Sequence, residues 1–341
     1  MVVLVTGASG QLGQSIQYIA GNYPNLQFVF CSSSELDITN LENCEEIFSK
    51  SKPDFCINAA AYTAVDKAES EPEKAHLINV IGSKNLAEVC KKHKTILVHI
   101  STDFVFDGSK TQPYSEKDSI NPKSVYGQTK LDGEIAIQEV FDTYFIIRTS
   151  WVYSQFGNNF MKTMIRLGSE RDSLSVVNDQ IGTPTNAVDL AEVLIKIICH
   201  TERVISSIVE KRSANFQLPT SNFGVYNFSN EGTCSWFDFA KKIFEINQIN
   251  IDLQPIPTTA YPTPAERPKY SVLDKTKINQ YIPNQDSINQ GENKTGLVTY
   301  TTLTSKFKGY MDNSTVVSMY NNTRGEREEL KEAFYFINAD A

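Results

Sequence analysis

The sequence predicts an α/β protein with a parallel, doubly wound sheet and a smaller C-terminal lobe. Three observations predict it. Short apolar runs alternate with helical patterns over residues 1–150, the first run leads directly into a glycine cluster, and small or hydroxyl-bearing residues follow several of the runs. In such sheets the strands end at one shared edge, where ligands bind.

The first apolar run, residues 2–5, is followed by glycines spaced G-x-x-G-x-x-G at Gly7, Gly10 and Gly13. A helical pattern continues through Ile16 and Ile19. Glycine lets the backbone approach a pyrophosphate, and a helix N-terminus favours an anion. A strand, a glycine turn and a helix in this order therefore predict dinucleotide binding, whereas a glycine cluster alone indicates only a turn.

The second apolar run, residues 26–31, leads into three serines, Ser32 to Ser34, and then Asp37. Asp37 is a candidate for the adenosine end of a cofactor, and also for the N-cap of the helix that follows Asn40. No Arg or Lys follows this strand to clamp a 2′-phosphate, although the serines could hydrogen-bond one. The choice between NADH and NADPH therefore stays open.

The third run, residues 54–58, continues into the small residues 59–61. Small residues at the end of a strand let a planar ligand lie against the backbone, although tight packing would also explain them. A long helix is predicted over 73–92, with its inward side chains at Leu77, Ile78, Ile81, Leu86 and Val89. A fourth strand over 95–100 ends in the segment 101–108.

Tyr126 and Lys130 stand four residues apart in a helix that we expect to begin after the N-cap Ser124. They would share one face of that helix. A nearby ammonium lowers the pKa of a phenol, so the pair suits proton transfer to or from a carbonyl or alcohol oxygen. Taken alone, the pair is more typical of an exposed helix surface than of a catalytic site. Gly10, Ala60, Thr102 and Tyr126 all fall at the same predicted sheet edge, which favours a site.

After a strand over 144–148 the alternation becomes less regular. Helices are predicted over 159–167, 187–199 and 236–244, strands over 174–177 and 225–228, and an irregular insertion over 201–223. From residue 280 polar residues dominate, apart from a β-like run at 297–303 and a charged helical segment at 326–336. We therefore expect a nucleotide-binding domain over 1–150, to which some later segments return. A second lobe follows over 151–278, and then a polar tail over 279–341 whose role the sequence does not indicate.

Composition excludes several classes of protein. The net charge of −8 offers no basic surface for nucleic acid, and no apolar segment approaches the length of a membrane span. Six scattered cysteines and the absence of a signal peptide indicate a reduced, cytoplasmic protein. The four histidines have no ligand spacing, so no metal site is expected.

The motifs together resemble the extended short-chain dehydrogenase/reductases and, among them, the dTDP-4-dehydrorhamnose reductase family. The resemblance covers roughly residues 1–278 and a specific order of motifs. These motifs are the segments 7–13, 36–39, 58–66, 101–108, 126–130, 148–153 and 182–185, closed by Arg267-Pro268, Ser271 and Leu273-Asp274.

The resemblance implies a Rossmann-like fold with a substrate-binding C-terminal lobe, and reduction of the C4 ketone of dTDP-4-dehydro-L-rhamnose by NADPH or NADH. It implies that Tyr126 protonates the alkoxide, that Lys130 tunes Tyr126 and binds the ribose, and that Thr102 holds the sugar oxygen. It also implies that the cofactor is held by Gly7, Gly10, Gln11, Leu12, Gly13, Asp37, Ile38, Ala60, Ala61, Tyr62 and Thr63. The substrate would contact Val65, Asp103 and Trp151.

Two positions depart from the family pattern. Some members dimerise through a magnesium ion held near the position of Ser15, which cannot supply a carboxylate here, so we expect a monomer or weak homodimer. The residues after 279 do not resemble the family's short C-terminal helix.

Two alternatives stay open: another nucleotide-sugar reductase or epimerase, and a non-catalytic regulatory subunit like that of methionine adenosyltransferase. Phe104 stands where a dehydratase would need a second proton-transferring residue, which favours simple reduction.

Overall fold

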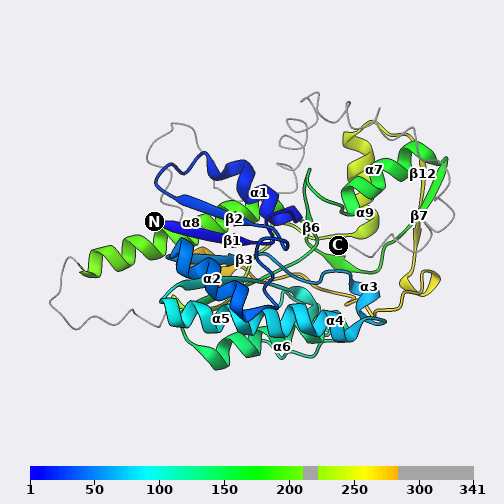
Figure 1. Ribbon diagram of the computed structural model, residues 1–341. Helices are drawn as coiled ribbons and strands as arrows, with labels where there is room; N and C mark the ends of the chain where they lie inside the picture. The colour runs from blue at the N-terminus through cyan, green and yellow to red at the C-terminus, as the bar shows by residue number, and fades with distance from the viewer. Residues whose placement is uncertain (210–221, 283–341) are drawn as a thin grey trace.

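A parallel six-stranded sheet forms the centre of the computed structural model, which describes residues 1–209 and 222–282 (Figure 1). The strand order is β2-β1-β3-β4-β5-β10, so the chain leaves β1 for one side of the sheet and then returns to its other side. This confirms the predicted parallel, doubly wound sheet and places the reversal of strand order between β1 and β3. The strands are β1 (Val2–Thr6), β2 (Gln27–Cys31), β3 (Phe55–Asn58), β4 (Ile96–Thr102), β5 (Tyr144–Thr149) and β10 (Gly224–Asn227).

Helices cover both faces of the sheet, as Figure 1 shows. One face carries α1 (Gln11–Ala20) and α8 (Ala187–Val209), which pack on each other. The opposite face carries α2 (Leu41–Ser51), α5 (Gly82–His93) and α6 (Val125–Val140). Both faces of every central strand are therefore buried, which explains why these strands read as continuous apolar runs.

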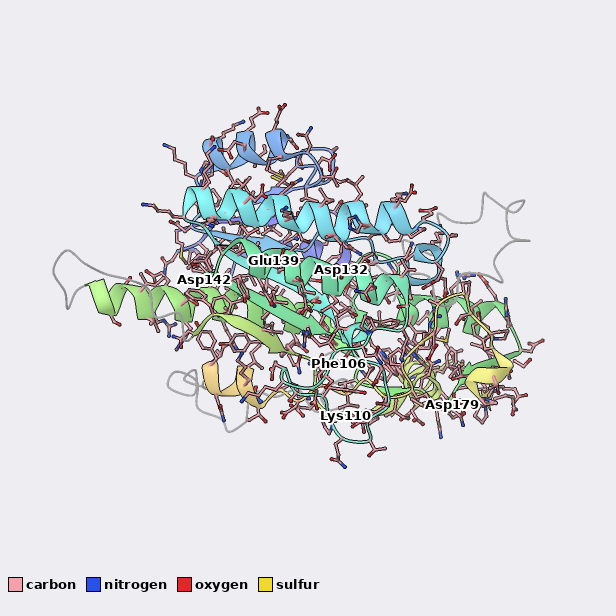
Figure 2. The ribbon with its side chains drawn as sticks, turned by 90° about the horizontal axis from the view of Figure 1, so that it is seen from below. Phe106, Lys110, Asp132, Glu139, Asp142 and Asp179 are labelled. Atoms are coloured by element: carbon pink, nitrogen blue, oxygen red, sulfur yellow. The ribbon has the colours of Figure 1, made fainter. Side chains whose placement is uncertain are left out.

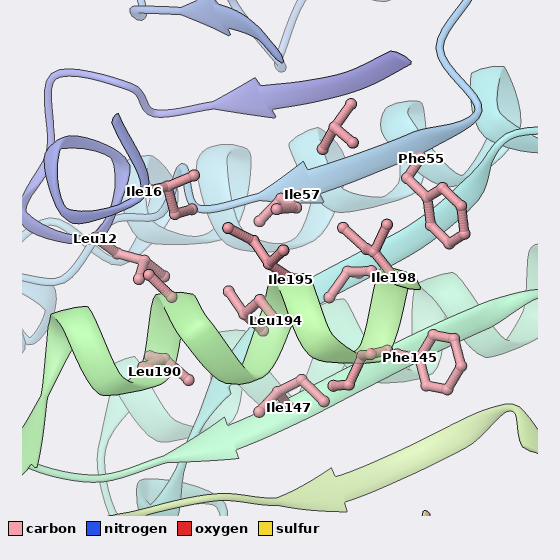
Figure 3. Close-up of a cluster of buried hydrophobic side chains, with 14 of the residues drawn as sticks. Leu12, Ile16, Phe55, Ile57, Phe145, Ile147, Leu190, Leu194, Ile195 and Ile198 are labelled. Carbon is pink, nitrogen blue, oxygen red and sulfur yellow. The ribbon is translucent and has the colours of Figure 1, made fainter. Parts of the chain in front are cut away.

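Helix α8 is the main cover of its face. In Figure 3 its apolar side chains lie over the strands and α1; those labelled are Leu190, Leu194, Ile195 and Ile198 from α8 with Leu12, Ile16, Phe55, Ile57, Phe145 and Ile147. The helix continues to Val209, so the predicted irregular insertion over 201–223 is wrong for residues 201–209. The core contacts continue beyond residue 199, because Ile205 still packs on the cluster and Thr201 is hydrogen-bonded to Tyr281 at 2.8 Å.

A π-helical turn interrupts the long helix predicted over 73–92. The segment consists of α4 (Pro72–His76), the π-helical turn Leu77–Ile81 and α5. A π turn adds one residue to the helical repeat and shifts the phase of the side chains. Leu77 is consequently 46% exposed, contrary to its predicted inward position, and Asn79 is buried.

The second lobe is built from α7 (Phe160–Glu170), β7 (Ser173–Val177), α9 (Trp236–Ile246) and β12 (Asp252–Ile256), which lie together at one end of the molecule in Figure 1. Its core is separate from the two sheet cores and rich in aromatic residues. Figure 2 places Asp179 in this lobe, where its carboxylate accepts hydrogen bonds from the backbone and side chain of Thr258. Smaller elements complete the described chain: α3 (Val65–Ala68), β6 (Val152–Tyr153), β8 (Ile181–Gly182), β9 (Thr185–Asn186), β11 (Cys234–Ser235) and α10 (Thr276–Tyr281), with 3₁₀ turns Asp103–Val105 and Thr258–Ala260.

The expected β-like run at 297–303 and helical segment at 326–336 lie outside the described residues. Within residues 1–209 and 222–282, no helix combines the length and apolar character needed to cross a membrane.

Candidate active site

A cavity of about 430 Å³ lies at the carboxyl edge of the sheet, between the sheet and the second lobe. Its size is within the usual range for a small-molecule site. Twelve of the residues expected at the site line it: Gly10, Gln11, Leu12, Ala60, Ala61, Thr63, Val65, Thr102, Asp103, Tyr126, Lys130 and Trp151. Five do not line it: Gly7, Gly13, Asp37, Ile38 and Tyr62.

Gly7 and Gly13 shape the wall of the cavity from behind. Gly7 has a φ of +63°, and a Cβ there would lie 2.7 Å from the backbone nitrogen of Ala60. A Cβ on Gly13 would lie 2.4 Å from the carbonyl oxygen of Gly7. The two glycines therefore let β1, β3 and α1 meet closely. Gly10 precedes α1 without any side-chain cap, so the first N–H groups of this helix fit an anionic group such as a pyrophosphate.

The side chain of Gln11 ties this helix start to the second lobe. Its Nε2 donates to the carbonyl oxygen of Val152 at 3.1 Å. Its Oε1 accepts from Asn159 Nδ2 at 2.7 Å and from Ser154 Oγ at 3.2 Å. One amide thus holds the glycine loop and the entry to α7 together.

Asp37, Ile38 and Tyr62, three expected cofactor residues that do not line the cavity, have other contacts in this structure. Asp37 accepts hydrogen bonds from the backbone and hydroxyl of Thr39, whereas the N-cap of α2 is Asn40, so the N-cap interpretation of Asp37 is wrong. Ile38 is buried in the core between α2 and α5. Tyr62 donates its hydroxyl to Glu71 at 2.9 Å, and its backbone N–H donates to Asn79 at 2.8 Å.

Tyr126 is brought to the sheet edge by the start of α6. Ser124 caps the helix as expected, because its hydroxyl accepts the N–H of Gly127 at 3.1 Å. A Cβ on Gly127 would lie only 2.4 Å from the carbonyl oxygen of Phe104. Glycine therefore allows α6 to approach the end of β4, where the ring of Phe104 packs edge-on against Tyr126 with 5.5 Å between centroids.

Thr102, Asp103 and Tyr126 form a buried polar group. The Thr102 hydroxyl donates to Asp103 Oδ1 at 3.1 Å and lies beside the Tyr126 phenol. Asp103 is 2% exposed, and its second oxygen, Oδ2, has no hydrogen-bond partner among the described residues. Burial raises the pKa of Asp103 to about 6, although the neighbouring Ser271 and Thr102 hydroxyls oppose the rise.

Burial also raises the pKa of Tyr126 to about 12, although the neighbouring Thr102 hydroxyl opposes the rise. The expectation that Lys130 would lower this pKa is therefore not met. Lys130 is turned away to the sheet: its Nζ donates to the carbonyl oxygen of Ile100 at 2.6 Å and lies 3.4 Å from His99 Nε2. Tyr126 is consequently a neutral phenol near pH 7, the protonation state that a proton donor requires.

Lys130 is itself 2% exposed. Burial lowers its pKa to about 8, although the charge of Glu134 opposes the fall. At pH 7 Lys130 is therefore mostly protonated, and it loses its proton as the pH rises through about 8.

The chain's two tryptophans stack on each other at the wall of the cavity. The rings of Trp151 and Trp236 lie 3.6 Å apart between centroids, with 11° between their planes. Phe160 packs on Trp236 from the second lobe at 4.6 Å. Trp151 has a φ of +48°, an uncommon backbone conformation for a bulky residue that is held here by its surroundings.

Sequence reasoning missed Trp236 and Gln180 in the cavity wall, and gave no role to Arg267, which also lines it. Arg267 binds the Asp66 carboxylate with both terminal nitrogens, at 2.9 and 2.7 Å. It so joins α3 to the loop between the 3₁₀ turn Thr258–Ala260 and α10. The rarity of tryptophan in this chain was the available signal for Trp236.

Comparisons with known proteins agree on one family. The family described as the RmlD substrate binding domain matches residues 1–287. The dTDP-4-dehydrorhamnose reductase of Aggregatibacter actinomycetemcomitans is 43% identical over 291 residues, which cover 84% of this chain and 94% of that protein.

Two solved structures are similar in fold and sequence. One is a dTDP-4-dehydrorhamnose reductase from Clostridium acetobutylicum, with a TM-score of 0.72 and 44% identity, covering 81% of this chain and 91% of that one. The other is the enzyme from Bacillus anthracis in complex with NADP, with a TM-score of 0.74 and 39% identity, covering 82% and 92%. The chain therefore belongs to the family of dTDP-4-dehydrorhamnose reductases.

Proposed function

We propose that this protein reduces the C4 ketone of dTDP-4-dehydro-L-rhamnose to dTDP-L-rhamnose, with NADPH or NADH as the reductant. The single observation that supports this best is that Thr102, Tyr126 and Lys130 line one cavity with an uncapped helix N-terminus and a tryptophan pair. The names and the bound NADP of the relatives support the same reaction.

The residues of β1, β3 and α1 fit a dinucleotide. Gly10, Gln11 and Leu12 would hold the pyrophosphate at the start of α1, and Ala60, Ala61 and Thr63 would line the remaining cofactor. Asp37 and Ile38 are assigned to the adenosine side and Tyr62 to the lining of the cofactor, with Gly7 and Gly13 shaping the turn. When bound, the nicotinamide supplies a hydride to C4 of the sugar.

The chain supplies the proton and the positioning. Charge develops on the C4 oxygen as the hydride arrives, and a donor must meet it. Tyr126 donates its phenolic proton to that oxygen, and Thr102 holds the oxygen by its hydroxyl. Lys130, mostly charged at pH 7, would bind the nicotinamide ribose with its ammonium.

The sugar nucleotide would contact Val65, Asp103 and Trp151, and we infer that Trp236 sets the position of Trp151. Trp236→Ala is expected to raise KM for the nucleotide sugar about 2–10-fold with a smaller change in kcat, because an aromatic pair contributes about 0.5–1.5 kcal/mol. Trp236→Phe keeps a ring and should change KM by less than half as much. Steady-state kinetics measure both variants. Equal KM values for wild type and Trp236→Ala would contradict this role.

We infer that residues 1–150, together with α8 and β10, mainly hold the cofactor and that residues 151–278 mainly hold the sugar nucleotide. Among the described residues that line the cavity, Asp103 is the only carboxylate. A dehydratase needs a second acid or base at this point, so simple reduction is favoured over dehydration. A regulatory subunit would not require Thr102, Tyr126 and Lys130 together in a cavity.

The deciding experiment is a spectrophotometric assay of NADPH and NADH oxidation, each with dTDP-4-dehydro-L-rhamnose, with the product identified by mass spectrometry and NMR. We expect stoichiometric formation of dTDP-L-rhamnose. Binding of either cofactor without turnover would instead support the regulatory role.

Assembly is expected to be independent of magnesium. Ser15 is fully buried, and its hydroxyl donates to the carbonyl oxygen of Gln11 at 2.9 Å, so this position offers no carboxylate to a metal. Within the described parts of the chain, no cluster of three or more His, Cys, Asp or Glu side chains could hold a metal. Sedimentation in excess EDTA should therefore give the same mass as sedimentation with magnesium, for a monomer or weak homodimer. A halved mass in EDTA would refute this.

A further inference from the structure

A chain of buried polar side chains crosses the sheet from β1 to α6 and ends at Lys130. The Thr6 hydroxyl donates to Asn58 Oδ1 at 2.7 Å, Asn58 Nδ2 lies 3.0 Å from His99 Nδ1, and His99 Nε2 lies 3.4 Å from Lys130 Nζ. Thr6, Asn58 and His99 are each at most 1% exposed. None of them is used in the proposed reaction.

The hydrogen bonds fix the orientation of the Asn58 amide. Its Oδ1 accepts from the Thr6 hydroxyl and also from the backbone N–H of Ala60, at 3.2 Å. Rotating the amide would place its NH₂ group against the N–H of Ala60, two donors facing each other. The NH₂ group therefore faces His99, and because an NH₂ group only donates, His99 Nδ1 must accept.

The tautomer of His99 follows from this. Burial and the charge of Lys130 hold the pKa of His99 well below its ordinary value, so the ring is neutral. A neutral imidazole carries one hydrogen, and with Nδ1 accepting it is on Nε2. His99 consequently presents an N–H, and not a lone pair, to Lys130.

This contact distinguishes the two forms of Lys130. An ammonium has donors only, so its interaction with an N–H is repulsive, whereas a neutral amine accepts a hydrogen bond through its lone pair. We propose that His99 is a positioning residue for Lys130. The Thr6–Asn58 pair fixes the His99 ring as the Nε2–H tautomer. This N–H directs the Lys130 ammonium to the Ile100 carbonyl and favours the neutral form of the amine.

The other groups around Lys130 do not supply this effect. Glu134 lies one turn further along α6 and favours the ammonium, although it is bound to Arg148 of β5. Tyr126 lies one turn earlier and is neutral. From β4 the titratable neighbour of Lys130 is His99. Behind His99 lie Asn58 of β3, which contacts His99, and Thr6 of β1, which contacts Asn58, and both are uncharged.

The consequence for the proposed reaction is a lysine whose proton is held weakly. After Tyr126 gives its proton to the substrate, a tyrosinate must be reprotonated before the next turnover. A Lys130 ammonium that His99 destabilises is a better acid toward this tyrosinate, and the neutral amine that remains then takes a proton from solvent. This step rests on the proposed role of Lys130, whereas the tautomer and the titration of Lys130 do not.

The first test is NMR of the wild-type protein without cofactor or substrate. Two-bond ¹H–¹⁵N correlations of the imidazole show which nitrogen carries hydrogen, and assignment is simple with four histidines. We expect His99 to be the neutral Nε2–H tautomer. An Nδ1–H tautomer or an imidazolium near pH 7 overturns the proposal, whether or not the protein proves to be a reductase.

The second test compares two variants of similar side-chain volume. His99→Met has no donor, whereas His99→Gln offers an acceptor to Asn58 and an N–H to Lys130. The pH at which Lys130 loses its proton, followed through its side-chain NMR signal and assigned with Lys130→Met, should rise by about half to one unit in His99→Met. It should return toward the wild-type value of about 8 in His99→Gln.

The alkaline limb of the kcat–pH profile should move in the same way. A purely structural role of His99 would lower the thermal midpoint, or lower kcat by the same factor at every pH. The pH at which Lys130 loses its proton and the pH of the alkaline limb would then both stay unchanged, which overturns the proposal. Equal shifts in the Met and Gln variants overturn it too, because they would show that side-chain volume and not the N–H is responsible.

Discussion

Tyr126→Phe is expected to lower kcat by about 10²–10⁴-fold, the usual contribution of a general acid. This corresponds to about 3–5 kcal/mol of activation free energy. The substitution removes only the hydroxyl, so the ring still packs edge-on against Phe104, and the dissociation constant of NADPH should change only a few-fold. Stopped-flow or steady-state kinetics with dTDP-4-dehydro-L-rhamnose measure the loss, and calorimetry measures cofactor binding.

Tyr226→Phe is the matched control. The Tyr226 hydroxyl is also removed from a largely buried ring, where it donates to the carbonyl oxygen of Asn222 at 2.6 Å on the far edge of the sheet. It does not line the cavity, so kcat should stay within about twofold of wild type while stability falls by about 1 kcal/mol. If Tyr126→Phe keeps more than about a tenth of wild-type kcat, the phenol is not the proton donor.

Glu134→Gln is expected to lower the free energy of unfolding by about 3–5 kcal/mol, because it leaves a buried guanidinium without its counter-charge. Arg148 Nε and Nη2 donate to the two oxygens of Glu134 at 3.0 and 2.6 Å, and both side chains are at most 2% exposed. One face of the guanidinium lies 5.3 Å from the ring of Phe106, which Figure 2 labels. Because both charged side chains are buried, water has little access to replace the carboxylate. Equilibrium urea unfolding measures the change.

Glu139→Gln, on the same helix, removes an equal charge from an exposed position (Figure 2) and should change stability by less than about 0.5 kcal/mol. The double substitution Glu134→Met with Arg148→Met should recover most of the loss, because a buried ion pair replaced by apolar side chains costs little. A loss below about 1 kcal/mol for Glu134→Gln would show that the pair is not needed to offset the buried charge.

Local patterns in the sequence predicted the parts of the site that depend on neighbours along the chain. The Ser124 cap fixes the start of α6, and with it the shared face of Tyr126 and Lys130. The glycine spacing fixes the turn between β1 and α1. The order of strands and helices fixes the sheet, because crossover connections between parallel strands have one allowed hand.

The remaining features depend on partners far away in the chain, which periodicity cannot identify. A pattern shows which face of an element is buried but not which side chain lies opposite. Asn79 is buried only because a π turn shifts the phase of its helix, and Lys130 turns from Tyr126 because Ile100 and His99 lie behind it. Gln11 meets Asn159, and Asp66 meets Arg267, only after the second lobe has folded onto the sheet.

The late position of β10 and α8 in the chain has a consequence during translation. Strand β10 pairs with β5, and α8 covers the face that carries Ile57 and Ile147, yet both are synthesised well after residue 150. A ribosome adds about 5–20 residues per second, so the emerging sheet spends roughly 4–15 s with an open strand edge and a bare apolar face. Such surfaces associate with other chains. The yield of native protein in a cell therefore depends on elongation rate and chaperone supply during those seconds, and not only on the stability of the finished fold.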